Sequence, residues 1–214
     1  MLQRDYLLRM TEMLAAALSK ILFNIEKKDY AKAENEIVSA AKTIIGLDLK
    51  MINILNIEDI MKLMKTSDLY AGRCIVSAEL MNEYGFVIKM NGNETESINI
   101  YQKSLRLYLE ALLAKEIPEP GKYFSKVNEL ILKLKEVEIS DELNKLLIDY
   151  YELSGQYSKA EDIIFQLLEN QNTEIKNKAV SFYKKLHLKS DEDLIAGNLS
   201  REEINESLEE ISQM

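Results

Sequence analysis

Apolar residues recur at intervals of three and four along almost the whole 214-residue chain. This spacing marks one face of an α-helix, and no strand-like alternation of useful length interrupts it. The chain holds only 7 Gly and 2 Pro, far below an average share of roughly 12% for the two together. A turn-rich β-sandwich and a disordered linker are therefore excluded, and an all-α fold is predicted. Helices are expected near 2–26, 29–45, 57–66, 68–90, 94–116, 121–137, 141–154, 157–170, 174–187 and 201–212, with a further short one near 48–54.

One segment, residues 144–168, shows the pattern of two antiparallel helices joined by a tight bend. Gly155 allows a left-handed turn between them, and the small side chain of Ala160 lets the second helix approach the first closely. The segment resembles a tetratricopeptide repeat. The residues that carry this resemblance are Leu147, Tyr151, Gly155, Tyr157 and Ala160, with Ile164 and Leu167 continuing the face.

Two weaker copies align with this segment, around 81–108 and around 20–44. The copies stand close to two repeat lengths apart, so we expect a degenerate helix pair between each visible pair. The resemblance implies an all-α, right-handed antiparallel helix-hairpin array with degenerate repeats. We expect a single helical-repeat domain over 1–214, a sub-domain break at 117–121, where two prolines resist helix formation, and an acidic C-terminal helical cap over 190–214.

The first 45 residues also resemble a family of uncharacterised bacterial proteins that open with a D-Y-x-x-R-x-x-E pattern. The matching residues are Asp5, Tyr6, Arg9 and Glu12. This resemblance implies a helical-repeat fold and a cytoplasmic location, and it supplies no site residues.

Charge is unevenly distributed along the chain. The formal net charge is −9, and residues 190–214 contribute −7 of it, from eight acids and one arginine. This balance argues against nucleic acid and anionic membrane as partners, because both require clustered Lys and Arg. The apolar run 13–25 is interrupted by Lys20 and is shorter than a membrane span. We therefore expect a cytoplasmic protein without a signal peptide.

The inventory of reactive residues predicts a protein that is not an enzyme and has no cofactor or metal. The single histidine, His187, stands near a helix end without a nucleophile motif, and the single cysteine, Cys74, lies among apolar neighbours. Phosphate-binding glycine loops are absent from the sequence. One cysteine and one histidine cannot form a CxxC or two-histidine metal site.

Two surfaces are candidates for binding a protein or peptide. The first is the inner face of two helix pairs, where an acidic groove around 142–152 would suit a basic peptide; its residues are Glu79, Asn82, Phe86, Lys89, Glu142, Lys145, Asp149 and Glu152. The second is the first helix, whose apolar positions extend over more than one face. It is either covered by the chain itself, or forms a homodimer seam or a docking groove for a partner; its residues are Leu7, Met10, Leu14, Leu18 and Leu22.

The acidic C-terminal segment also has two interpretations, a polar closing helix that caps the last repeat or a docking element for a basic partner. Together these features predict a non-catalytic module for protein–protein or protein–peptide interaction, acting as a scaffold, adaptor or regulatory subunit. A signal-peptide-responsive regulator, which would need an enclosed polar groove, is one alternative. An enzyme of unrecognised type, which would need a deep pocket with converging titratable groups, is the other.

Overall fold

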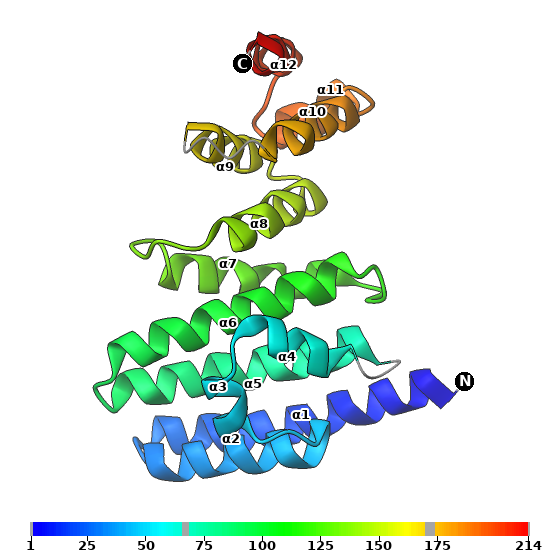
Figure 1. The fold of residues 1–214 in the computed structure, drawn as a ribbon. Coiled ribbons are helices and arrows are strands. Elements are labelled where there is room, and N and C mark those ends of the chain that lie inside the picture. Colours follow the sequence, from blue (N-terminus) through cyan, green and yellow to red (C-terminus); the bar gives the residue numbers. More distant parts are fainter. Residues whose placement is uncertain (1, 66–68, 170–173, 214) are drawn as a thin grey trace. The chain divides into compact units, whose positions relative to one another are not determined.

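The computed structural model describes residues 2–65, 69–169 and 174–213, and every regular element in these ranges is helical (Figure 1). The chain forms two compact units, Met1–Glu138 and Ile139–Met214. The first unit contains α1 (Leu2–Glu26), α2 (Tyr30–Ile45), α3 (Leu49–Ile54), α4 (Ile57–Met64), α5 (Tyr70–Met90), α6 (Glu94–Leu113), the 3₁₀ helix η1 (Pro120–Tyr123) and α7 (Phe124–Lys133). The second contains α8 (Asp141–Ser154), α9 (Tyr157–Glu169), α10 (Ile175–Leu186), α11 (Asp191–Ala196) and α12 (Arg201–Gln213).

Helix α5 forms the centre of the first unit. It packs against α1, α2, α4 and α6, while α1 also packs against α2. Its buried residues lie on all sides of the helix, from Ala71 to Ile88. A helix with buried residues on all sides is expected to be surrounded by other helices, and α5 is such a helix.

Two hydroxyl groups of α6 fix its contact with α5. Ser97 donates a 2.7 Å hydrogen bond to the backbone carbonyl of Gly85, and Ser104 donates one of the same length to the carbonyl of Ala78. The α5 residue Gly85 is buried and lies directly against the ring of Tyr101. Small residues at the crossing therefore bring the two helices close together.

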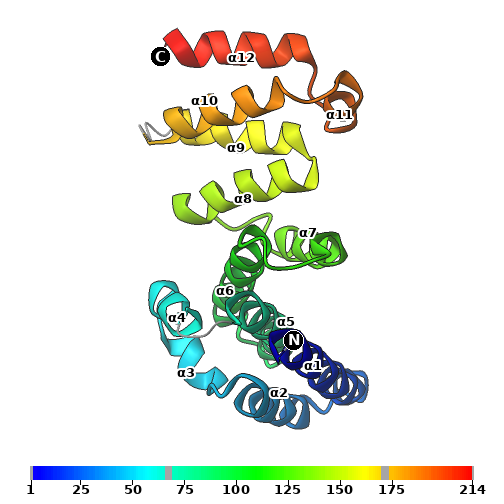
Figure 2. The same cartoon turned by 90° about the vertical axis from the view of Figure 1, so that its right-hand side faces the viewer.

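The segment between α2 and α5 differs from the predicted degenerate helix pair. Residues 49–64 form only the two short helices α3 and α4, and α2 packs directly on α5. Helix α4 contacts both α5 and α6, and α3 and α4 lie to one side of these two helices in Figure 2. Asp48 and Asn56 cap the two short helices through side-chain oxygens, which explains why each begins where it does.

In the second unit, local signals determine the ends of α8. The Ser140 side chain accepts a hydrogen bond from the amide of Leu143 at its start, and Gly155 ends it with φ = 73°. Helix α9 follows two residues later and packs against α8, so the predicted two-helix bend at Gly155 is confirmed. Helix α10 packs against α9 and α12.

The acidic C-terminal segment contains one helix that we did not predict, α11, in addition to α12. Ser200 and Glu203 form a capping box at the start of α12, because each side chain accepts a hydrogen bond from the other residue's backbone amide. Ile204 and Ile211 of this helix are buried, whereas Glu202 and Glu209 are exposed. The segment is therefore amphipathic, with its acids toward solvent.

The predicted break at 117–121 lies inside the first unit, and the division between the units falls after Glu138. None of the described helices combines the length and the apolar composition needed to cross a lipid bilayer.

Candidate interaction surfaces

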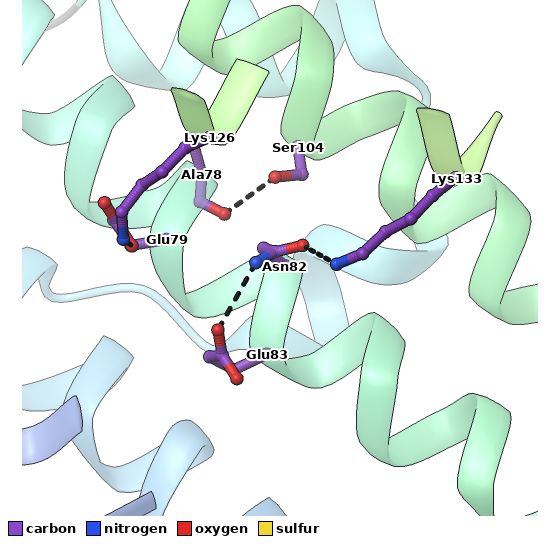
Figure 3. Close-up of polar contacts among 7 residues, drawn as sticks. All are labelled: Ala78, Glu79, Asn82, Glu83, Ser104, Lys126 and Lys133. Atoms are coloured by element: carbon purple, nitrogen blue, oxygen red, sulfur yellow. Dashed lines mark hydrogen bonds and ion pairs between the residues drawn. The ribbon is translucent and has the colours of Figure 1, made fainter. Parts of the chain in front are cut away.

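The polar face of α5 is covered by α7. Glu79 is only 4% exposed and forms an ion pair with Lys126 of α7 (Figure 3). The Asn82 side-chain oxygen accepts a 2.9 Å hydrogen bond from Lys133, also on α7. Two of the four predicted partner-binding residues on α5 are therefore already engaged by the chain itself.

A second carboxylate of α5, Glu83, lies beside Asn82 and is half-buried. Burial raises the pKa of the Glu83 carboxyl above its usual range, and the Asn82 amide donates to this carboxyl over 3.3 Å. The Lys133 ammonium also lies 4.7 Å from the centre of the Tyr101 ring, within cation–π range. The two lysines of α7 thus supply positive charge where α5 presents carboxylates.

The other two predicted residues on α5 lie nearer its C-terminal end. Phe86 is half-buried, and Lys89 is exposed and forms a 3.0 Å ion pair with Glu94 at the start of α6. Lys89 is therefore also engaged by the chain itself.

Helix α8 is tied to α10 by a row of three ion pairs, which we call the α8–α10 ladder. Lys145 pairs with Glu174 over 2.7 Å, Asp149 with Lys178, and Glu152 with Lys185 over 2.9 Å. Glu174 is the residue that precedes α10, and the other two partners lie within it.

The ladder changes the charge that we expected on this face of α8. Of the predicted residues on α8, only Glu142 is exposed, and the carboxylates of Asp149 and Glu152 are neutralised by lysines. The charges of two of the carboxylates expected to form an acidic groove around 142–152 are therefore balanced by lysines of α10. A basic peptide would have to displace those lysines.

The lysines of α7 and α10 are the residues that sequence reasoning missed. Lys126 and Lys133 stand seven residues apart on α7, and Lys178 and Lys185 stand seven apart on α10. A seven-residue interval places both side chains of each pair on one face of a helix. This spacing is the sequence signal that could have revealed them.

The outward side of α10 carries a shallow hollow of about 370 Å³. Its lining combines apolar and polar side chains, and Leu188 among them is 88% exposed. The described residues that line it are Asn177, Val180, Ser181, Lys184, Lys185 and Leu188.

The predicted self-association residues of α1 differ in how deeply they are buried. Met10 and Leu14 are buried, Leu7 and Leu18 are half-buried, and only Leu22 is exposed. Because α1 packs against α2 and α5, Met10 and Leu14 belong to the core of the first unit and are not available for a homodimer seam.

The two residues considered for catalysis lie in different units of the chain. His187 is exposed at the end of α10, and burial raises the pKa of the Cys74 thiol to about 12, so the thiol stays protonated at neutral pH. Within the described part of the chain, no three His, Cys, Asp or Glu side chains are grouped so that they could hold a metal ion.

A buried polar network joins α9, α10 and α12. Tyr183 of α10 and Ser207 of α12 both donate hydrogen bonds, of 2.8 and 2.9 Å, to the same oxygen of Glu161 on α9. Burial raises the pKa of Glu161, while the two hydrogen bonds act in the opposite direction. The network holds three helices together.

These features describe an all-helical protein whose polar side chains mainly join its own helices. Residues 1–214 match the model of a family of unknown function, DUF6483, and the chain belongs to that family. No curated protein and no solved structure matches the chain.

Proposed function

We propose that this protein is a non-catalytic module for protein–protein interaction, a scaffold, adaptor or regulatory subunit that acts in the cytoplasm. We further propose that its helices form a degenerate array of antiparallel hairpins of the tetratricopeptide type. The proposal rests on the contacts between helices described above, and above all on one recurring arrangement.

In that arrangement, a helix forms an ion pair with the helix that comes two helices later in the chain. Glu79 of α5 pairs with Lys126 of α7, and Asp149 of α8 pairs with Lys178 of α10. In both cases an intervening helix packs against the first helix, α6 on α5 and α9 on α8. Stacked hairpins bring their first helices side by side in this way.

A helix stack fixed by such contacts offers a partner a surface that is already formed. Binding to it costs less ordering free energy than binding to a mobile segment. In the second unit, the α8–α10 ladder holds α10 in place, and the outward side of α10 carries the hollow. We therefore propose that this side of α10 is a binding surface.

Site-specific photo-cross-linking in cells that produce the protein natively tests the proposal. A photoreactive amino acid is placed at Ser181 in the hollow, at Glu142, and at Phe86, with the exposed α9 residue Gln166 as the control position. We expect a discrete cross-linked protein from Ser181 that Gln166 does not give. If none of the three test positions gives a product distinct from the control, the proposed function is wrong.

The two alternatives are not favoured by any particular observation. A signal-peptide-responsive regulator would need an enclosed polar groove, whereas the hollow on α10 is open. The enzyme interpretation would need titratable groups that converge in a pocket, and the hollow is lined by Lys184 and Lys185 without a histidine, carboxylate or thiol among its described residues.

A further inference from the structure

The outward side of α10 is not used by the core of its own unit. The residues of the hollow follow one another at helical intervals from Asn177 to Leu188, so they lie on a single face. The opposite face of α10 is buried through residues such as Phe182 and Tyr183. The hollow therefore lies where a partner could reach it without disturbing the packing of the unit.

The shape and lining of the hollow suit an apolar side chain flanked by polar groups. Val180 is half-buried, and Leu188 stands at the edge with 88% of its surface exposed. A single exposed leucine is common on protein surfaces and needs no explanation by itself. Here it adjoins a hollow of about 370 Å³ that also presents the amide of Asn177 and the hydroxyl of Ser181.

Charge identifies the kind of partner. The three ion pairs of the α8–α10 ladder balance one another, and Lys184 is an additional exposed cation beside the hollow. Residues 174–189 contain five lysines and one glutamate, although the whole chain has a net charge of −9. Of these lysines only Lys184 and Lys185 line the hollow, and no carboxylate is among the residues that line it. Lys185 pairs with Glu152 of α8, so the charge that Lys184 brings to the hollow is not balanced by a lining residue, and complementary charge on the partner would be acidic.

We propose that the outward face of α10 binds an acidic amphipathic segment of a partner protein, with an apolar side chain of that segment in the hollow and a carboxylate on Lys184. This inference rests on the proposed function and specifies the chemistry of the partner.

Synthetic peptides test the partner chemistry directly. The probe is a fluorescein-labelled peptide of about 14 residues, long enough to form a helix, with leucines on one face and glutamates on the other. A matched peptide carries lysine at every glutamate position, and a second one carries serine at every leucine position. Binding to the full chain is followed by fluorescence anisotropy, and the contact site by amide chemical shifts in ¹H–¹⁵N spectra.

Of the three peptides, we expect only the acidic one to bind. Its binding should change amide chemical shifts mainly between residues 177 and 188. Lys184→Glu should weaken binding at least about tenfold, because it replaces an attraction by a repulsion. Leu188→Ser should also weaken it. The control Lys42→Glu makes the same charge change at an exposed residue of α2 and should leave affinity unaltered.

Several results would overturn the inference. The acidic peptide could fail to bind, or the basic peptide or single-stranded DNA could bind as strongly as the acidic peptide. The chemical-shift changes could also fall outside α10. The cross-linking experiment separates this failure from failure of the proposed function. If Ser181 gives a specific cross-link but the acidic peptide does not bind, the module stands and the partner chemistry is wrong.

Discussion

The ring of Tyr101 on α6 lies against Gly85 on α5 so closely that a Cβ added to Gly85 would stand 2.7 Å from Cε1 of Tyr101. Real Cβ atoms essentially never come this near to another heavy atom. The backbone of α5 thus forms part of the surface on which the Tyr101 ring packs. If the residue at position 85 carried a side chain, the Tyr101 ring could not keep its present position.

Gly85→Ala should destabilise the protein by about 1–3 kcal/mol, the usual cost of overpacking a core. Urea unfolding of the variant and of the parent protein measures this. Gly121→Ala is the control, because nothing lies within 4 Å of a Cβ at that position and its backbone is not in the left-handed region. Equal midpoints for Gly85→Ala and the parent protein would show that the contact is not as close as described.

Gly155→Ala tests the bend between α8 and α9 by a different mechanism. Nothing lies within 4 Å of a Cβ at Gly155, so only the positive φ of 73° opposes the substitution. The left-handed conformation costs a residue with a side chain about 1 kcal/mol relative to glycine. We expect a loss of that size in urea unfolding and a smaller loss for Gly155→Asn, since asparagine tolerates this conformation better. An alanine variant as stable as the parent would contradict the assigned geometry.

Lys126→Met tests the ion pair between α5 and α7. The Glu79 side chain is only 5% exposed, so removal of its cation leaves a buried carboxylate without its countercharge. A cost of about 1–3 kcal/mol in the free energy of unfolding is expected. Lys42→Met, at an exposed lysine, is the matched control and should change little.

The double variant Glu79→Gln/Lys126→Met should recover part of this loss, because a neutral amide is less costly to bury than a charge. Two results would contradict this ion pair. Lys126→Met could be as stable as the control variant, or Glu79→Gln could lower the free energy of unfolding further when added to Lys126→Met.

The stability of the second unit should depend on pH through Glu161. Its pKa is raised above the ordinary value of 4.5, because burial disfavours the charged form. A carboxyl with a raised pKa in the folded state binds its proton more tightly there than in the unfolded state. The contribution of Glu161 to stability is therefore fully present below pH 4.5 and is lost as the pH rises through the raised pKa. Its charge therefore opposes folding at neutral pH.

Glu161→Gln keeps an oxygen that can accept from Tyr183 and Ser207 but removes the buried charge. The variant should be more stable than the parent at pH 7, and the difference should shrink toward pH 4. Thermal unfolding over this range, with the exposed Glu202→Gln as control, measures the effect. A difference that is independent of pH would show that the carboxyl does not titrate as we expect.

The sequence predicted those features that depend on residues within one helical turn. Ser140 and the Ser200–Glu203 pair act on backbone groups three residues away, so they mark helix starts without knowledge of the fold. Gly155 marks a helix end for the same reason. The six-residue helix α11 was missed because it is too short to show periodicity, although Ser190 caps it.

The interaction surface could be predicted only in part. Spacing placed Lys145, Asp149 and Glu152 together on one face of α8, and the structure shows that all three pair along the same neighbouring helix. Spacing could not show that α10 lies opposite, since the partners are 29 to 33 residues away along the chain and nothing local selects between helices. For this reason we expected an acidic face on α8, whereas lysines of α10 neutralise two of its carboxylates.

A charge-swap cycle on Asp149 and Lys178 tests the central claim most directly, namely that polar groups of α8 bond to α10. Asp149→Lys and Lys178→Asp should each destabilise the protein by about 0.5–1 kcal/mol in urea unfolding at low salt, since the pair is partly exposed. The double variant should recover most of that loss, and 1 M NaCl should weaken both the loss and the recovery, because at roughly that concentration charges are screened within about 3 Å. If the double variant instead loses the sum of the two single effects, the residues do not face each other, and the proposed stack of hairpins is wrong.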